Sequence, residues 1–221
     1  MLIDLSHTVE HGMITYKGLP GPIISDHLSR AASRSVYEAG TEFLIGKIEM
    51  VANTGTYLDS PFHRYPDGKD LSELELNLLA NLDSVVVRAS AAGAKDDQRG
   101  ISPTSLNGRE LKGKAVLFHT GWDKYWRTEK YSEGTHPYLM VETVEFLLSA
   151  QPALVGIDSF NLDDTSTGKR PAHSLLLAAN IPIVEHLCNL ESVPDLEFRF
   201  FAVPVKVKGF GTFPVRAFAI A

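Results

Sequence analysis

Two separate stretches of the 221-residue chain hold side chains that could act together on a small molecule. The first runs from Asn53 to His63 and reads Asn-Thr-Gly-Thr-Tyr-Leu-Asp-Ser-Pro-Phe-His. It places a carboxylate, Asp59, four residues before an imidazole, His63. Carboxylates bind divalent cations, and an imidazole changes its protonation near neutral pH. This pair of residue types therefore suits metal-assisted or acid–base chemistry.

The second stretch contains His173 and Glu185. Pro171 suits the first turn of a helix, where its missing N–H costs nothing, and Asn180 suits the left-handed position that ends a helix. His173 is therefore expected in the opening turn of a helix. Residues 181–184 are expected to form a short buried strand that ends at Glu185. A histidine at a helix start and a carboxylate at the end of the next strand can converge on one point, and the sequence alone leaves open whether they do.

The first stretch needs a strand to position it. An apolar, β-branched run at 43–51 predicts a strand that leads into it. If the backbone stays extended as far as Asp59, alternate side chains share a face. The face that holds Asp59 is then the polar one, and it includes Asn53, Gly55 and Tyr57. Pro61 cannot continue a central strand, so His63 is expected on a turn beyond it.

The remaining pattern predicts further strands and helices. Strands are expected at 2–6, 22–34, 35–51, 85–87, 115–119, 153–157, 198–207 and 213–219. The strands at 22–34 and 35–51 are expected to form a hairpin or meander with Gly40 at a bend, and the last two are expected to form a hairpin. Helical spacing is found at 70–79 and 142–149, and the polar stretch 94–100 predicts a loop. No repeat or linker is visible. With 221 residues and 44% apolar content, we expect a single domain that spans residues 1–221.

Composition excludes several classes of partner. The net charge is −6, the pI is near 5.7, and no run of lysines or arginines is present. These features argue against nucleic acid and against an anionic membrane, and they favour a small-molecule substrate. The single cysteine, Cys188, rules out an internal disulfide and is expected to be a small buried residue. No apolar run is long enough to span a bilayer, so we expect a cytoplasmic location.

The first stretch resembles the signature of the cyclase family of metal-dependent hydrolases, which includes the bacterial kynurenine formamidases and the isatin hydrolases. The family pattern is H-x-G-T-H-x-D-x-P-x-H. This chain supplies five of its positions, namely Gly55, Thr56, Asp59, Pro61 and His63. It has Asn53 and Tyr57 where the family has its two leading histidines. The likeness covers nearly the whole chain, from the Asp4-Leu5-Ser6 strand to the final hairpin.

The resemblance implies an α/β protein with the swivelling β/β/α fold, in which helices flank a mixed sheet, and it implies a homodimer. In the family, the loop after the first strand lies near the site, and here that loop carries His11 and Tyr16. The family's C-terminal metal ligands correspond to His173 and Glu185.

The resemblance also divides the metal ligands into two groups. In two-metal relatives, the leading histidines and the aspartate hold one ion, and the aspartate, the later histidine and the glutamate hold the other. Here the first ion would keep only Asp59. Because an amide oxygen is a weak zinc ligand and a phenol resists losing its proton, that site should be empty or weak. We therefore expect one divalent ion, zinc or manganese, held by Asp59, His173 and Glu185.

The activity that the resemblance implies is hydrolysis of a carbon–nitrogen amide bond. The closest activity is that of an arylformamidase of tryptophan catabolism, which converts N-formylkynurenine to kynurenine and formate, or acts on a related aryl amide. His63 would carry a proton to the leaving amine, and Tyr57 would donate a hydrogen bond to the developing oxyanion. Substrate contacts are expected from three further side chains, those of Asn53, Phe62 and Trp122.

Several alternatives stay open. The site could open the ring of a cyclic amide or lactone, as isatin hydrolases do. The chain could instead be a metal-free binding protein that is not catalytic, which the residues Asn53 and Tyr57 favour. Without any ion, Asp59 and Glu185 could act as an acid and base pair, with one of them holding its proton. Taken singly, each of the three expected ligands could also be a capping or ion-pairing residue.

Overall fold

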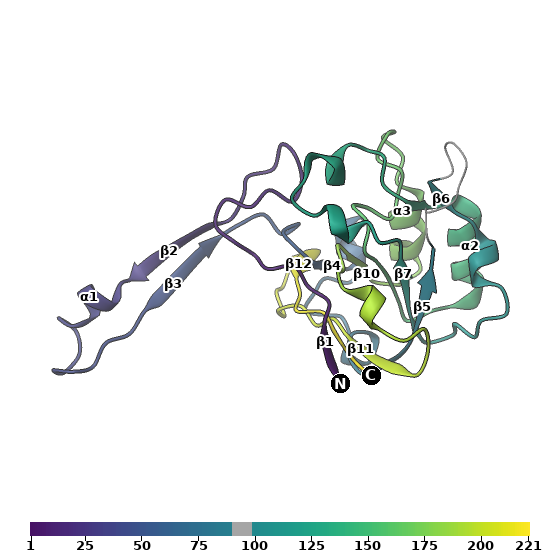
Figure 1. Ribbon diagram of the computed structural model, residues 1–221. Helices are drawn as coiled ribbons and strands as arrows, with labels where there is room; N and C mark the ends of the chain where they lie inside the picture. Colours follow the sequence, from purple (N-terminus) through teal and green to yellow (C-terminus); the bar gives the residue numbers. More distant parts are fainter. Residues whose placement is uncertain (90–98) are drawn as a thin grey trace.

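The computed structural model of the chain describes residues 1–89 and 99–221. Its centre is a nine-stranded mixed sheet with the strand order β1-β13-β11-β5-β7-β9-β10-β4-β12 (Figure 1). The four strands β5, β7, β9 and β10 run parallel to one another, and the other pairs are antiparallel. The bounds are β1 Leu2–Asp4, β4 Tyr57–Asp59, β5 Leu82–Arg88, β7 Ala115–His119, β9 Leu154–Ile157, β10 Ile183–Glu185, β11 Phe198–Phe201, β12 Thr212–Pro214 and β13 Phe218–Ile220.

The two ends of this sheet lie near each other. Strands β12 and β13 are far apart in the strand order, yet only three residues separate Pro214 from Phe218. Such a connection spans at most about 14 Å, so the sheet has to curl. The predicted C-terminal hairpin is therefore correct only in part: β11 pairs with β13, whereas β12 pairs with β4 at the other end of the order.

Two cores pack on the two faces of the sheet. The helices α2 (Val141–Ala150) and α3 (Pro171–Ala178) cover one face, where Val85 and Val87 of β5 contact them as part of a buried cluster. Val86 belongs to the cluster on the opposite face, inside the curl of the sheet. Because β5 has apolar residues at consecutive positions, both of its faces can be buried, as expected of a central parallel strand.

Two small residues, Gly156 and Cys188, are closely surrounded by other side chains. A Cβ atom on Gly156 would lie 2.8 Å from a methyl group of Leu117 and 2.9 Å from one of Leu187, so a larger residue there would require both leucines to shift. Cys188 is buried as expected. Burial, with a further contribution from the carboxylate of Asp123, raises the pKa of the Cys188 thiol to about 12. A thiol that stays protonated is a poor nucleophile.

A long hairpin projects from the body of the protein (Figure 1). It consists of β2 (Ile23–Leu28), the short helix α1 (Arg30–Ser33) and β3 (Ile45–Glu49), and β2 pairs with β3. The pairing predicted for the strands at 22–34 and 35–51 is confirmed as a hairpin. The prediction that the strand at 43–51 leads directly into the central sheet is wrong. Residues 53–56 do not form a strand, and the extended segment that carries Asp59 begins at Tyr57.

The other short elements connect the sheet to its loops. The two-residue strands β6 (Gly100–Ile101) and β8 (Tyr138–Leu139) pair in parallel. The 3₁₀ turns are η1 Pro61–His63, η2 Leu76–Leu78, η3 Pro103–Leu106, η4 Asp123–Tyr125, η5 Glu129–Ser132 and η6 Leu190–Ser192. The loop predicted at 94–100 lies outside the described residues except for its last two positions. Within the described ranges, none of the helices is long and apolar enough to cross a membrane.

The helix predicted at 70–79 is wrong, because only η2 forms there. The side chain of Asp70 accepts hydrogen bonds from the backbone N–H groups of Ser72, at 2.8 Å, and Gly209, at 2.5 Å. These bonds lower the pKa of Asp70 and tie the segment to a distant loop. An aspartate that bonds nearby backbone groups in this way competes with helix formation.

Candidate active site

Strands β4 and β10 direct their side chains to the same place. They are antiparallel neighbours, with Glu185 opposite Tyr57 and Ile183 opposite Asp59. Because opposite residues and residues two apart share a face, all four side chains point to the side of the sheet that α3 covers. His173 lies in the first turn of α3 and so comes down onto the same face. The predicted convergence of Asp59, His173 and Glu185 is what this geometry produces.

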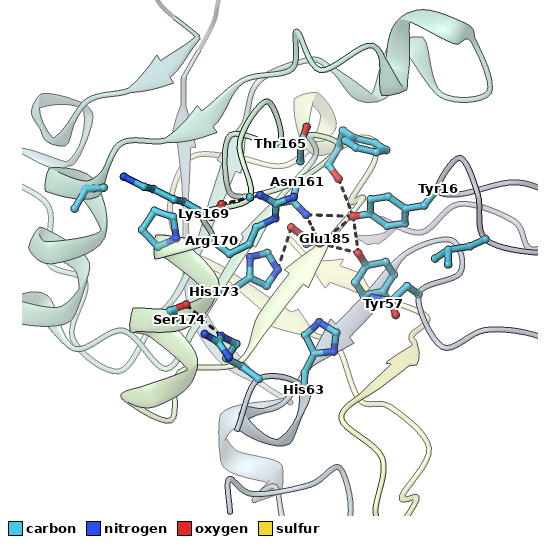
Figure 2. Close-up of a pocket in the computed structure, with 17 residues that line it drawn as sticks. Tyr16, Tyr57, His63, Asn161, Thr165, Lys169, Arg170, His173, Ser174 and Glu185 are labelled. Atoms are coloured by element: carbon cyan, nitrogen blue, oxygen red, sulfur yellow. Dashed lines mark hydrogen bonds and ion pairs between the residues drawn. The ribbon is translucent and has the colours of Figure 1, made fainter. Parts of the chain in front are cut away.

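The three side chains form one buried cluster (Figure 2). One ligand atom from each of Asp59, His173 and Glu185 lies within 4.8 Å of the others. Nε2 of His173 is 3.6 Å from Oε1 of Glu185 and 3.7 Å from Oδ2 of Asp59. Two ligands bound to one zinc ion at tetrahedral angles lie about 3.4 Å apart. These separations are too long for good hydrogen bonds and are close to those of ligands around a common ion.

Asp163 orients His173. Nδ1 of His173 lies 2.6 Å from Oδ2 of Asp163, and the same carboxylate accepts hydrogen bonds from the backbone N–H groups of Ala172, at 2.7 Å, and His173, at 3.2 Å. Because a carboxylate only accepts, Nδ1 carries a proton and a neutral His173 presents the lone pair of Nε2 to the cluster. A carboxylate behind a histidine is the usual outer support of a metal ligand.

Neutral donors surround Glu185. Its two oxygens accept hydrogen bonds from Leu162 N at 2.7 Å, Tyr57 Oη at 2.7 Å, Asn161 Nδ2 at 3.3 Å and Tyr16 Oη at 3.3 Å. Figure 2 shows the two phenol groups meeting at this carboxylate. Their oxygens are 2.8 Å apart. The donors fix the orientation of Glu185 from the side opposite to His173.

Burial and charge set the protonation of this network. Burial disfavours the charged forms of His173 and Glu185, but their mutual attraction outweighs it, so the pKa of His173 lies well above its ordinary value and that of Glu185 lies below. Burial and then the charge of Glu185 raise the pKa of Tyr57 well above its ordinary value. Tyr57 is therefore a neutral donor, and its proton is directed to Glu185.

Asp59 has fewer partners. Its Oδ1 accepts a hydrogen bond from the hydroxyl group of Thr212. Its Oδ2 is buried and, among the residues that the structure describes, has no hydrogen-bond partner. A buried carboxylate oxygen without a donor is costly unless a cation neutralises it. The unpartnered oxygen, the oriented imidazole and the two carboxylates together fit a divalent metal ion.

Thr212 also fixes the tautomer of His63. Its Oγ1 lies 2.8 Å from Nδ1 of His63, and its own proton is donated to Asp59. Nδ1 of His63 must therefore be the donor in this contact, so a neutral His63 carries its free lone pair on Nε2. Gly211 permits the approach, because a Cβ atom there would lie 2.5 Å from the Cα atom of His63.

A cavity of about 890 Å³ opens above the cluster and is lined by Asn53, Tyr57, His63, His173 and Glu185. Two predicted substrate contacts lie elsewhere. Phe62 is half-buried in η1, and Trp122 packs against Tyr131 and Phe160 and donates its indole N–H to the carbonyl of Tyr131 at 3.1 Å. Neither of them is among the described residues that line the cavity. The aromatic residues that line it are Tyr16, Tyr57 and Phe160.

Sequence reasoning missed three residues of the site, which are Asn161, Asp163 and Thr212. A signal existed for two of them, because Asn161 and Asp163 follow the carboxyl end of the parallel strand β9, where functional side chains gather in α/β sheets. Thr212 had no such signal. The expectation that the loop after the first strand approaches the site agrees with the position of Tyr16.

Comparison with known proteins places the chain among relatives of one family. The model of the Cyclase family matches residues 3–164. The kynurenine formamidase of Bacillus cereus is 26% identical over 216 residues, which cover 97% of this chain and 95% of that protein. The kynurenine formamidase of Salinibacter ruber is 29% identical over 174 residues, which cover 78% of each chain.

Solved structures share the fold. Isatin hydrolase A from Labrenzia aggregata, bound to benzyl benzoate, superposes with a TM-score of 0.82 at 22% identity and covers 99% of this chain and 93% of its own. The crystal structure of a novel cyclase gives a TM-score of 0.83 at 16% identity and covers 100% and 88% of the two chains. The expected α/β fold, a mixed curled sheet with flanking helices, is confirmed. Since the family model covers well over half of its length, the chain belongs to the Cyclase family, as its motif predicted.

Proposed function

We propose that the protein is a metal-dependent hydrolase of carbon–nitrogen amide bonds with an arylformamidase-like activity. The observation that carries this proposal is the cluster of Asp59, His173 and Glu185, in which one buried carboxylate oxygen has no donor among the described residues. The class of bond comes from the kynurenine formamidases, which align along 97% of the chain. The substrate we propose is N-formylkynurenine or a related small aryl amide.

Asp59, His173 and Glu185 would hold one divalent ion, for which we propose zinc or manganese. Two oxygen ligands and one imidazole nitrogen suit either metal, and two negative charges balance the charge of the ion. When bound, such an ion polarises a carbonyl group and lowers the pKa of a coordinated water. Asp163 and Tyr57 keep two of the ligands in place from outside the cluster.

His63 is the residue that we assign to proton transfer. Its Nε2 is the free nitrogen of the neutral ring, and the side chain lines the cavity. It can take a proton at Nε2 and give it to the leaving amine. Asn53 lines the same cavity and can offer an amide hydrogen bond to the substrate. Tyr57 is assigned a positioning role, because its single proton is directed to Glu185 rather than to a developing oxyanion.

A second candidate is hydrolysis of a cyclic amide or lactone. The observation in its favour is the fold shared with isatin hydrolases at TM-scores of 0.81 and 0.82. A site that attacks an acyclic aryl amide could also open a ring of similar size. Comparing turnover of N-formylkynurenine, isatin and simple lactones by one preparation separates the two. We expect kcat/KM to be highest for N-formylkynurenine, and a higher value for isatin would reverse the assignment.

The deciding experiment is elemental analysis of untagged protein, coupled to an amidase assay before and after treatment with a strong chelator. We expect about one ion for each chain, loss of turnover on chelation and recovery when zinc or manganese is returned. Turnover by metal-free protein would move the chemistry to the carboxylate pair. Metal-free protein without turnover on any of these substrates would favour the non-catalytic binding protein.

We further propose that the protein is a homodimer and that it resides in the cytoplasm. An isolated two-stranded hairpin is at best marginally stable in water, and the projecting hairpin exposes apolar residues, among them Ile24, Phe43 and Ile48. A second copy would cover them. Light scattering should give twice the mass of the chain for the native protein and a lower mass for Phe43→Glu combined with Ile48→Lys, while Glu38→Gln on the same hairpin leaves it unchanged. The lone cysteine supports a reducing compartment.

A further inference from the structure

Three positively charged side chains, those of Arg64, Lys169 and Arg170, line the cavity. The protein as a whole has a net charge of −6, so this concentration of positive charge runs against its composition. Among the described residues that line the cavity, Glu185 is the only acidic one. Its charge is already paired with His173, and its oxygens accept hydrogen bonds from neighbouring donors. The outer part of the cavity is therefore cationic.

Arg170 is the most constrained of the three. It is the N-cap residue of α3 and is half-buried. One terminal nitrogen of its guanidinium group donates to the carbonyl groups of Thr167, at 2.7 Å, and Lys169, at 2.6 Å. The side chain of Arg170 is one of those that line the cavity (Figure 2). The loop thus holds one edge of the guanidinium group and leaves its other nitrogens available to a ligand.

The acidic residues nearest in sequence are engaged elsewhere. The carboxylate of Asp163 is bound to His173, and that of Asp164 forms an ion pair with Arg99 at 3.3 Å. Arg170, Arg64 and Lys169 form no ion pair with any carboxylate in the described part of the chain. A half-buried guanidinium group that lacks a counter-ion is a ready site for a carboxylate, which it can bind through two parallel hydrogen bonds.

We propose that Arg170, assisted by Arg64 and Lys169, binds a carboxylate group carried by the substrate. This inference rests on the proposed function and narrows the substrate class to aryl amides that bear a negative charge. Arg170 immediately precedes α3, His173 lies in the first turn of α3, and both side chains line the same cavity. The carboxylate should therefore be carried by the same small molecule as the amide that is cleaved.

The kinetic test compares two formamides that differ by one carboxylate, 2-formamidobenzoate and formanilide. We expect the metal-loaded native enzyme to prefer 2-formamidobenzoate at least tenfold in kcat/KM, mainly through KM. Arg170→Met should remove most of this preference, Arg170→Lys should keep part of it, and Arg199→Met, at an exposed arginine on β11, should leave it intact. Equal kcat/KM for the two substrates in the native enzyme, or a preference unchanged in Arg170→Met, would overturn the proposal.

A binding measurement separates this proposal from the proposed activity. Calorimetric titration of the metal-loaded protein with benzoate and with benzamide needs no turnover. We expect benzoate to bind at least tenfold more tightly than benzamide, and Arg170→Met to abolish the difference while its melting temperature stays within a few degrees of the native value. A benzoate preference that persists in Arg170→Met would assign the anion to the metal cluster and refute the role of Arg170, whether or not any amide is hydrolysed.

Discussion

The two carboxylates of the cluster lie on neighbouring strands, and their surroundings differ. Glu185 accepts hydrogen bonds from a backbone N–H group, an amide and two phenols. Asp59 accepts one, from Thr212, and its Oδ2 has no donor among the described residues. Both side chains are buried, so exposure to water does not explain the difference.

This comparison separates two tasks. The donors around Glu185 spread its negative charge over neutral groups and hold it still, so that it stays in place with or without a cation. The Oδ2 atom of Asp59 has no hydrogen-bond donor among the described residues. A buried carboxylate oxygen without a donor is stable only beside a positive charge. We therefore expect the affinity for the cation to depend most on Asp59. The rigidity of the site should depend most on the hydrogen-bond donors around Glu185.

The largest effect is expected for Asp59→Asn. Replacing the carboxylate by an amide removes one negative charge and the ligand oxygen that has no other partner, so metal binding should fall below detection at micromolar metal. Turnover that depends on the metal should fall at least about a thousandfold, beyond the effect of losing an outer-shell partner. Elemental analysis of the purified variant measures its metal content, and the amidase assay measures its turnover. Asp67→Asn, at an exposed aspartate just after η1, is the matched control.

His63→Ala should lower kcat by about 10²–10³-fold while the metal content stays at the native level. The reason is that His63 touches Thr212 and the cavity but lies outside the cluster of ligands, so its loss removes a proton carrier and leaves the ion in place. Thr212→Val should have a smaller effect on kcat, because the imidazole of His63 remains and only the hydrogen bond that fixes its tautomer is lost. A His63→Ala variant with undiminished kcat would remove His63 from the reaction.

Asp163→Asn should weaken metal binding by about 10–100-fold without abolishing it. The amide can still accept the hydrogen bond from His173, but it no longer supports the imidazole with a negative charge. Competition with a chelator of known affinity gives the change in Kd. At saturating metal, kcat should return to within a few fold of the native value, whereas a permanently low kcat would show that Asp163 acts on the reaction itself.

The parts of this site that could be predicted are those with a local cause. Strands β5, β7 and β9 follow from continuous apolar runs, and the start of α3 follows from Pro171. The ligand positions follow from a motif whose spacing reflects a strand followed by a turn. The segment 70–79 also has a local helical pattern, yet it does not form an α-helix. The hydrogen bond from the N–H group of Gly209 to Asp70 competes with that pattern, and it joins positions 139 apart in the sequence.

Other features depend on contacts that no local pattern encodes. Tyr16 meets Tyr57 and Glu185 only after the curled sheet has brought the N-terminal loop over β10. Thr212 reaches Asp59 because β12 pairs with β4, and the sequence favoured a hairpin at that place instead. The motif could therefore identify the three residues that meet in one cluster, whereas the hydrogen bonds that distinguish Glu185 from Asp59 required the folded chain.

The smallest expected effect is that of Tyr57→Phe, which removes one of the hydrogen-bond donors around Glu185. Removing the hydroxyl group takes away the shortest side-chain donor to Glu185 and a partner of Tyr16, so the free energy of unfolding should fall by about 1–3 kcal/mol. Metal content should stay at the native level, because Asp59, His173 and Glu185 all remain. Urea denaturation of both proteins gives the difference, and Tyr37→Phe on the projecting hairpin is the control.

The pH dependence of that difference sharpens the test. Because the pKa of Tyr57 in the folded protein lies well above the value of about 10 in the unfolded chain, the phenol stabilises the fold fully below pH 10. Its contribution should then fall as the pH rises through the folded pKa. The gap between the native protein and Tyr57→Phe should thus be constant from about pH 7 to 9 and narrow above about pH 10. A gap that instead widens between pH 7 and 9 would mean that Tyr57 ionises in the folded protein at a lower pH than in the unfolded chain, as a metal-bound phenolate would, and Tyr57 would then belong with the ligands.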